Sequence, residues 1–206
     1  MSMKGETLKM KFRKFITILA IVACAITGQA QNATAIFNKV VQTYRNSGTI
    51  SASYSTSGSR GTIVMQGSKF RVLAGDFKTW FDGRTQWTYS NATGEVNVTT
   101  PTAQEIAAIN PIAVASSLQK SYSMSAKSQG GKWVLTLTPR KAGKVKRIVL
   151  YVNGKYQLTA ARYIAKNGRT QSLTISNYRT HTSYPASTFT FNKKYVPRGT
   201  EIVDLR

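Results

Sequence analysis

The sequence predicts a mainly β domain, in which about eleven antiparallel strands are combined with a few short helices. Three observations lead to this fold class. Apolar and polar residues alternate with a period of two along most of the chain after Thr49. Asp-Gly, Asn-Gly and Gly-Gly pairs separate these runs at hairpin spacing. Helical periodicity is confined to the segment before Gly48 and to residues 102–119.

The first thirty residues have the pattern of an export signal. Basic residues precede a mostly apolar run, Phe15–Gly28, and Ala30 supplies a small residue at the cleavage point. The run is short for a membrane span, which needs roughly 20 apolar residues. We therefore expect residues 1–30 to be a signal peptide, and residues 31–206 to form a single domain in the periplasm.

The single cysteine, Cys24, leaves an alternative open. Ile21-Val22-Ala23-Cys24 loosely fits the pattern at which bacterial lipoproteins are acylated, although apolar residues follow the cysteine. With one cysteine and one histidine, His181, the chain can form neither an intramolecular disulfide nor a zinc site of four Cys and His ligands.

The charge of the chain is strongly positive, with 29 Lys and Arg against 7 Asp and Glu. Such a charge would suit a nucleic-acid partner, but export argues against one. The basic residues are scattered over strand-like segments, and the densest group contains Arg140, Lys141, Lys144, Lys146 and Arg147. We expect transient contact with an anionic membrane surface instead.

The elements follow one another in a simple order. Residues 31–46 form a helix whose apolar stripe includes Ile36, Val40 and Tyr44, and Gly48 follows its end. Two meanders and a short last strand come next; the expected strands are 50–55, 62–66, 69–73, 77–81, 85–90 and 95–99, then 121–127, 133–137, 146–152, 156–166 and 170–179.

Between the meanders, Thr102-x-x-Glu105 is a capping box and Asn110-Pro111 restarts a helix, so residues 102–119 form a helical insertion.

Three hairpin turns are predicted by their residue pairs. Asp82-Gly83, Asn153-Gly154 and Asn167-Gly168 supply the positive φ that a tight turn requires. Asn153-Gly154 is expected to join the strand ending at Val152 directly to Lys155 and Tyr156. Gly83 is expected at positive φ.

Catalytic and cofactor motifs are missing from the sequence. It contains no phosphate-binding loop, no His-Glu-x-x-His and no Gly-x-Ser-x-Gly. Asp82 is explained by its turn and Glu105 by its cap, while His181 has no acid near it in the sequence. We expect no catalytic, metal or cofactor residue, and no enzyme.

Apolar side chains remain as the candidate site. They would lie on one face of a curved sheet and on the helices above it, where they form either an ordinary filled core or a cavity that accepts apolar ligands. The candidates are Ile36, Val40, Phe70, Val72, Trp87, Tyr89, Ile106, Ile109, Val114, Leu118, Trp133, Leu135, Leu137, Ile148 and Leu150. We expect the insertion to act as a lid over the face that bears Trp87 and Tyr89.

Motifs along the expected mature chain resemble those of the LolA-type periplasmic lipoprotein carriers. They are the hairpin Asp82-Gly83-x-Thr85-x-Trp87-x-Tyr89, the insertion with Asn110-Pro111, and the end Phe189-Thr-Phe191…Pro197-x-Gly199-Thr-Glu-Ile-Val-Asp204. The resemblance implies an incomplete β-barrel, closed by short helices over an apolar cavity. It also implies a monomeric carrier that moves the acyl chains of lipoproteins from the inner to the outer membrane.

The partners implied by the resemblance are acylated lipoproteins, an inner-membrane ABC-type release complex and an outer-membrane acceptor. Gln66-Gly67-Ser68 stands where some carriers of this type have an Arg-Pro with a role in transfer, so no functional arginine is assigned. Two alternatives stay open: a membrane-anchored acceptor, LolB-like and lipidated at Cys24, and a lipid-sensing regulatory domain of the same superfamily.

Overall fold

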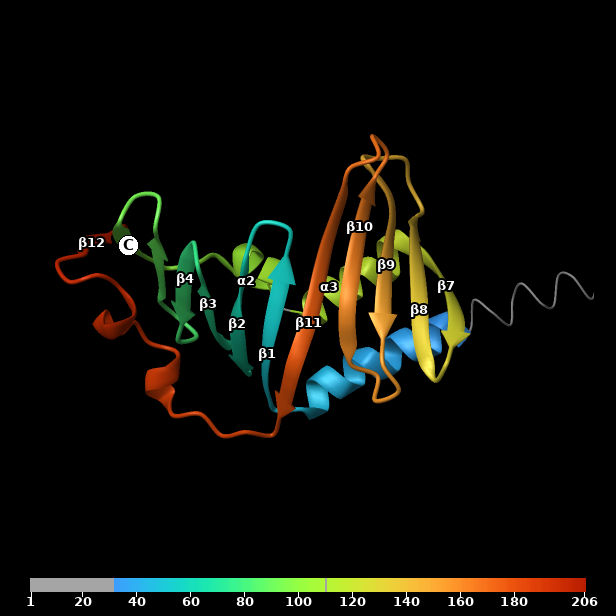
Figure 1. Cartoon of the computed structure of the whole chain (residues 1–206), viewed down its shortest axis with the longest axis horizontal. Coiled ribbons are helices and arrows are strands. Elements are labelled where there is room, and N and C mark those ends of the chain that lie inside the picture. Colours follow the sequence, from blue (N-terminus) through green and yellow to red (C-terminus); the bar gives the residue numbers. More distant parts are fainter. Residues whose placement is uncertain (1–31, 110) are drawn as a thin grey trace, which may run out of the picture.

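A computed structural model describes residues 32–109 and 111–206 of the 206-residue chain (Figure 1). The expected signal peptide, residues 1–30, and Cys24 lie outside the described residues. The side chains of residues 107–112 are also outside the description.

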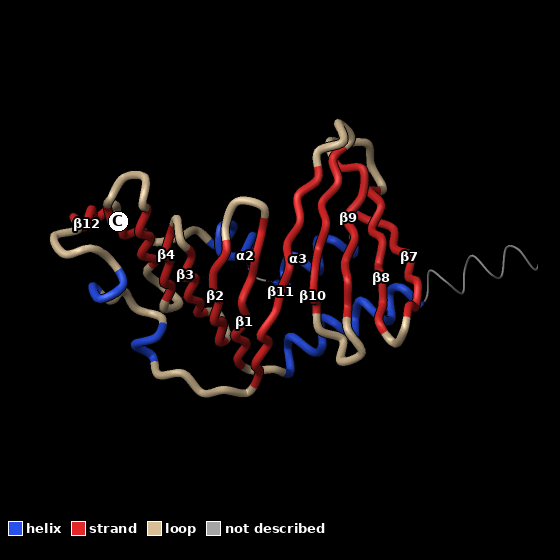
Figure 2. Tube along the Cα trace, in the orientation of Figure 1, coloured by secondary structure: helices blue, strands red, loops and turns tan. Residues whose placement is uncertain are grey.

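The described strands form a single sheet of twelve (Figure 2). Their bounds are β1 (Thr49–Thr56), β2 (Arg60–Gln66), β3 (Lys69–Ala74), β4 (Phe77–Phe81), β5 (Gln86–Ser90), β6 (Glu95–Thr99), β7 (Tyr122–Gln129), β8 (Lys132–Pro139), β9 (Val145–Val152), β10 (Leu158–Ala165), β11 (Thr170–Thr180) and β12 (Glu201–Asp204). The order across the sheet is β12-β6-β5-β4-β3-β2-β1-β11-β10-β9-β8-β7.

Two meanders make up this order. The strands β1 to β6 are consecutive neighbours, and so are β7 to β11, while β1 pairs with β11 where the meanders meet. We call this β1–β11 pair the central seam. The strands β12 and β7 form the two edges, so the sheet is not closed, and the predicted incomplete barrel is confirmed.

Helices cover one face of the sheet (Figure 1). The N-terminal helix spans residues 32–46, and the insertion contains α2 (Ala103–Ile109) and α3 (Pro111–Ser121). The predicted capping box is present: the Thr102 backbone N–H donates to Glu105 Oε2 over 2.8 Å, and the Glu105 N–H donates to Thr102 Oγ1 over 3.3 Å. We call the face under these helices the inner face and the opposite face the outer face.

The predicted turns are formed with one exception. Asp82 Oδ1 accepts the backbone N–H groups of Arg84 and Thr85, and Gly83 has φ +104°, as predicted. The direct Asn153-Gly154 hairpin is wrong, because β10 begins only at Leu158. Asn153 Oδ1 accepts two loop N–H groups, from Lys155 and Gln157, and positive φ falls on Tyr156. These side-chain hydrogen bonds stabilise a wider loop than a two-residue turn.

The last segment crosses to the far edge of the sheet (Figure 1). After β11 the chain passes through two short turns of 3-10 helix, η1 (Ala186–Thr188) and η2 (Lys193–Tyr195). The final strand, β12, pairs parallel with β6, and the Leu205 N–H donates to the Val98 carbonyl over 2.9 Å. This crossing lets the C-terminal segment lie against the first meander.

Candidate ligand cavity

The inner face is continuous across neighbouring strands of the first meander. Ala52 of β1 lies opposite Ile63 of β2, which lies opposite Val72 of β3. Residues directly opposite each other in antiparallel strands point to the same face. The short or branched side chains of these three residues therefore form one apolar surface below the helices.

A cavity of about 690 Å³ separates this surface from the helices. Its lining is almost entirely apolar and comes from both meanders and two helices. The N-terminal helix contributes Phe37, Val40, Val41 and Tyr44, and α3 contributes Val114, Ala115 and Leu118. The turn between β1 and β2 contributes Ser59. The strands contribute Ile50, Ala52, Tyr54, Thr56, Ile63, Met65, Val72, Phe77, Leu150, Leu158, Leu173, Ile175 and Tyr178.

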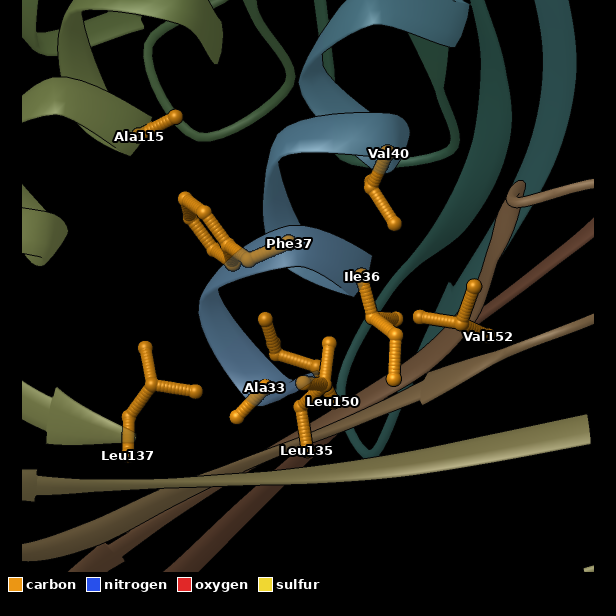
Figure 3. Packing of buried hydrophobic residues seen from close by; sticks show 9 residues of the cluster. All are labelled: Ala33, Ile36, Phe37, Val40, Ala115, Leu135, Leu137, Leu150 and Val152. Atoms are coloured by element: carbon orange, nitrogen blue, oxygen red, sulfur yellow. The ribbon is translucent and has the colours of Figure 1, made fainter. Parts of the chain in front are cut away.

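Beside the cavity, the same face is filled by a core (Figure 3). Leu135 and Leu137 of β8 are fully buried, and Ile36 of the N-terminal helix packs in the same cluster. The N-terminal helix also presents Phe37 and Val40 to the cavity, so one helix both closes the core and forms a wall of the hollow. The core is thus a rigid support for one side of the cavity.

Few polar groups face the cavity. At one end, the Thr56 hydroxyl donates to the Ser59 carbonyl over 3.0 Å, and the Ser59 hydroxyl donates to Asp76 Oδ1 over 2.8 Å. At the other end, the rings of Tyr44 and Tyr178 meet edge to face, 6.1 Å apart. Burial raises the pKa of both phenols above its ordinary value.

Five of the predicted site residues line the cavity: Val40, Val72, Val114, Leu118 and Leu150. Another group of predicted residues belongs to the adjoining core, namely Ile36, Trp133, Leu135, Leu137 and Ile148. Phe70 lies on the inner face beyond the cavity, where its ring packs on Phe81 at 5.3 Å. Ile106 is half-buried outside the lining, and the side chain of Ile109 lies outside the described residues.

The placement of Trp87 and Tyr89 under the lid is wrong. Trp87 lies opposite Trp80 in the β4–β5 pair, and both aromatic residues of β5 pack in a cluster on the outer face. The C-terminal segment covers that cluster, with Phe191 5.4 Å and Tyr195 5.9 Å from the Trp80 ring. Strand alternation shows which residues share a face, but a covering segment about a hundred residues away decides which face becomes core.

Several lining residues were not among the predicted ones. Tyr54, Ile63, Met65 and Tyr178 come from the strands at or next to the central seam. The period-two alternation of β1 and β2 was a signal for their shared face, but nothing local indicated that β1 and β11 would be neighbours. The cavity centre therefore depends on a long-range pairing.

The described residues offer little for other chemistries. They contain no group of three or more His, Cys, Asp and Glu side chains that could hold a metal ion. No helix in the same part of the chain has the length and apolar character needed to cross a membrane. What the arrangement can do is enclose an apolar group.

Three solved structures are similar to this chain to different degrees. An uncharacterized conserved protein from Thermus thermophilus has a similar fold, with a TM-score of 0.56 and 12% identity over 83% of this chain and 98% of that one. The crystal structure of MucB gives a TM-score of 0.48 and 15% identity over 79% of this chain and 63% of MucB. The complex of Pseudomonas aeruginosa MucA and MucB gives 0.44 and 12% over 81% and 62%.

No curated protein matches the sequence significantly. A family model does match, over residues 23–167, which is more than half of the chain. Its description is "Outer membrane lipoprotein carrier protein LolA". Together with the open twelve-stranded sheet and its helix-covered inner face, this match shows that the chain belongs to the LolA-like family of outer-membrane lipoprotein carrier proteins.

Proposed function

We propose that this protein is a periplasmic carrier, which holds the acyl chains of lipoproteins in its cavity and moves them from the inner to the outer membrane. The observation that carries the proposal is the apolar cavity of about 690 Å³ under the N-terminal helix and α3. Ordinary cores are filled to crystal-like density, so a hollow of this size is unusual in a domain without a ligand role. The family match supports the same function.

The size of the cavity suits one long acyl chain. If each methylene group takes the ~30 Å³ that one molecule occupies in liquid water, a cavity of about 690 Å³ holds roughly 20 of them. A lipoprotein with about three chains would need α3 to move outward. That movement is reasonable, because α3 is short and Val114 in it is 38% exposed.

Charge favours exchange of cargo at membranes. Without residues 1–30 the chain has 24 basic and 6 acidic residues, which leaves a charge of +18. A positive protein is attracted to anionic lipid surfaces within a Debye length, about 10 Å at moderate salt. In this proposal the protein receives cargo from an inner-membrane ABC-type release complex and delivers it to an outer-membrane acceptor.

The experiment that tests the proposal is binding of a neutral apolar fluorescent probe, N-phenylnaphthylamine, followed by displacement with an acylated peptide. Wild-type protein should bind the probe and release it to the peptide. Leu118→Glu should weaken probe binding at least tenfold, because a carboxylate at the cavity wall must be desolvated. Ser117→Glu is the matched control, since it adds the same charge at an exposed position of α3.

Two outcomes would contradict the proposal. The first is a wild-type protein that binds no probe although it is folded. The second is an equal effect of the two substitutions, which would mean that the charge acts at a distance and the cavity wall is not involved. Mass spectrometry of protein purified from its own envelope should, in addition, find a co-purifying acylated polypeptide.

A further inference from the structure

The two meanders differ sharply in charge. The first meander with its turns, residues 49–99, carries five Lys and Arg and three Asp and Glu. The second meander, residues 121–180, carries twelve Lys and Arg and no acidic residue. The sequence has no Asp or Glu anywhere between Glu105 and Glu201. The positive charge of the chain is therefore concentrated on the second meander, whose own strands supply no carboxylate to neutralise it.

Cationic side chains gather at one end of this meander. The turn between β8 and β9 and the turn between β10 and β11 project at the same end of the sheet (Figure 1). The Lys166 N–H donates to the Lys144 carbonyl over 2.9 Å, which holds the two turns together. The Arg140 N–H donates to the carbonyl of Ser121, the last residue of α3, over 2.9 Å. We call this region the basic end; its cations are Lys120, Arg140, Lys141, Lys144, Lys166 and Arg169.

The cations of the basic end are exposed and have no carboxylate partner. Among the residues that the structure describes, the single ion pair joins Arg206 to Asp204, after the edge strand β12. Like charges that lie close together repel one another and disfavour the compact state. An anionic partner that binds the basic end would relieve this repulsion.

A hollow of about 430 Å³ lies within the basic end. Lys120 lines it from the last turn of α3, and Arg140 and Lys141 line it from the β8–β9 turn. Half-buried residues add apolar surface to the same hollow, namely Tyr122, Pro139 and Val145. A guanidinium can bind two oxygens of one phosphate, and a lysine adds a mobile positive charge. The hollow thus combines groups that suit a phosphate with a surface that suits the glycerol carbons beside it.

We infer that the basic end is the surface by which the protein docks on a bilayer, with the phosphate groups of anionic phospholipids as its ligands. The inference rests on the proposed function, because it names the part of the same carrier that meets the membrane. A protein partner is usually bound through aromatic or apolar anchors. The two turns expose small or polar residues beside the cations instead, namely Ala142, Gly143, Asn167 and Gly168. A layer of charged headgroups requires no such anchor.

Docking at the basic end would place the cavity helix at the membrane. Lys120 follows Leu118 by two residues in α3, and Leu118 lines the cavity. A phosphate bound by Lys120 therefore holds the same short helix that must move outward to admit a larger ligand. This arrangement would bring the exchange of acyl chains next to the lipid surface.

The test is sedimentation with vesicles of two compositions. Wild-type protein should sediment with equal parts of phosphatidylglycerol and phosphatidylcholine, and should stay in solution with phosphatidylcholine alone. Each cation near an anionic surface changes partitioning about fivefold. Lys141→Glu/Lys144→Glu should therefore weaken binding by more than about tenfold, and Lys141→Gln/Lys144→Gln should give a smaller loss. Salt of about 1 M should release the wild type, because it shortens the Debye length to about 3 Å.

The matched control is Lys132→Glu/Lys155→Glu. Both lysines are exposed on the same meander, but they lie at its opposite end, where β7 meets β8 and β9 meets β10 (Figure 1). The eight residues of β8 span roughly 26 Å, which exceeds two Debye lengths of about 10 Å. The control should therefore lose no more than about twofold. Equal losses in the two Glu variants would mean that net charge alone attracts the protein, and would overturn the inference.

Other anionic ligands give different results. Inorganic phosphate should release no more protein from the vesicles than chloride does at the same ionic strength; stronger release would assign the hollow to a free anion. Failure of the wild type to sediment with phosphatidylglycerol would also overturn the inference. Binding of a labelled poly-glutamate peptide, lost in Lys141→Glu/Lys144→Glu, would in that case assign the basic end to an acidic protein.

Binding of N-phenylnaphthylamine, measured without vesicles, keeps this inference separate from the proposed function. All the double variants should bind the probe as wild type does, since their substitutions lie outside the cavity lining, and this result also shows that they are folded. If wild type binds the probe but not the vesicles, the carrier cavity stands and docking fails. If it binds the vesicles but no probe, docking stands and the carrier function fails.

Discussion

The inner face of the sheet has a filled half and a hollow half, although both lie under helices. In the filled half, β8 and β9 carry Leu135, Leu137 and Val152, which are buried to 1% exposure or less against the N-terminal helix. In the hollow half, β1 and β2 carry residues such as Ala52 and Ile63 beneath α3, and a space of about 690 Å³ remains. The same strand alternation therefore produces two different interiors.

The difference comes from what the helices contribute. The N-terminal helix presents large side chains such as Ile36 and Phe37, which reach the sheet. The side of α3 toward the cavity offers Val114, Ala115 and Leu118, and two of these are small. A helix with short side chains cannot fill the volume to the sheet unless it moves closer. Helix composition thus determines where a β-sheet core stays open.

The largest expected effect is a contrast between truncations in the two halves. Leu135→Ala should destabilise the protein by about 3 kcal/mol, because it creates a cavity in a close-packed core. Ile63→Ala should cost only ~1 kcal/mol, since it enlarges a hollow that already exists. Urea unfolding of both variants measures the contrast. Equal losses would mean that the two halves are packed alike.

The outer face provides the next test. Phe191→Ala should cost ~2 kcal/mol, because it removes the ring that packs on the fully buried Trp80. Binding of the apolar probe should be unchanged, since Phe191 and the cavity lie on opposite faces of the sheet. Loss of probe binding in a folded Phe191→Ala protein would connect the outer cluster to the cavity and remove the distinction between the faces.

Enlarging a small residue in each half should give opposite results. Ala33 is fully buried in the filled half, so Ala33→Leu should overpack the core and cost about 1–2 kcal/mol. Ala52 lines the hollow, so Ala52→Leu should be tolerated while it reduces the space for a ligand. Thermal unfolding and probe titration of the two variants measure these effects. If Ala52→Leu bound the probe as well as wild type does, the probe would have to bind outside the cavity.

The smallest expected effect is on alkaline stability. The pKa values of Tyr44 and Tyr178 are raised in the folded protein, whereas an unfolded tyrosine ionises near pH ~10. Their contribution to stability is complete below this pH and is lost as the pH rises above it, because the unfolded state releases protons first. The free energy of unfolding of Tyr178→Phe should therefore decline less steeply above pH ~10 than that of wild type, as measured by urea unfolding at a series of pH values. Tyr151→Phe, which changes a tyrosine on the outer face, is the control and should decline like wild type.

Much of the fold could be predicted from local chemistry. Gly83 follows Asp82 in a tight turn, and Thr102 and Glu105 cap α2, because each of these features depends on neighbours a few residues away. The Asn153-Gly154 turn was predicted wrongly, since Asn153 can also accept N–H groups farther along the loop. A residue pair does not determine loop length when its side chain has several partners in reach.

The site could be predicted only in part. Val40, Val72 and Leu150 were identified because the apolar periodicity of each helix or strand shows which of its side chains lie on the same face. Trp87 was placed on the wrong side, because the covering Phe191 is distant in sequence. Tyr178 was missed for a similar reason: its position depends on the seam and on the irregular backbone at Asn177, which alternation alone does not indicate.

The central seam has a consequence for the order in which the protein folds. Each meander forms from strands that follow one another, but the seam joins Ser53 to Asn177, 124 residues apart. Pairings of such high sequence separation are slow, because the chain entropy of a long loop is lost before the contacts form. The cavity walls come from both sides of the seam, so the binding site is complete only once the seam has formed. A bound ligand contacts both meanders, so it should slow the unfolding step in which they separate at the seam. The cargo would thus stabilise its own carrier against unfolding.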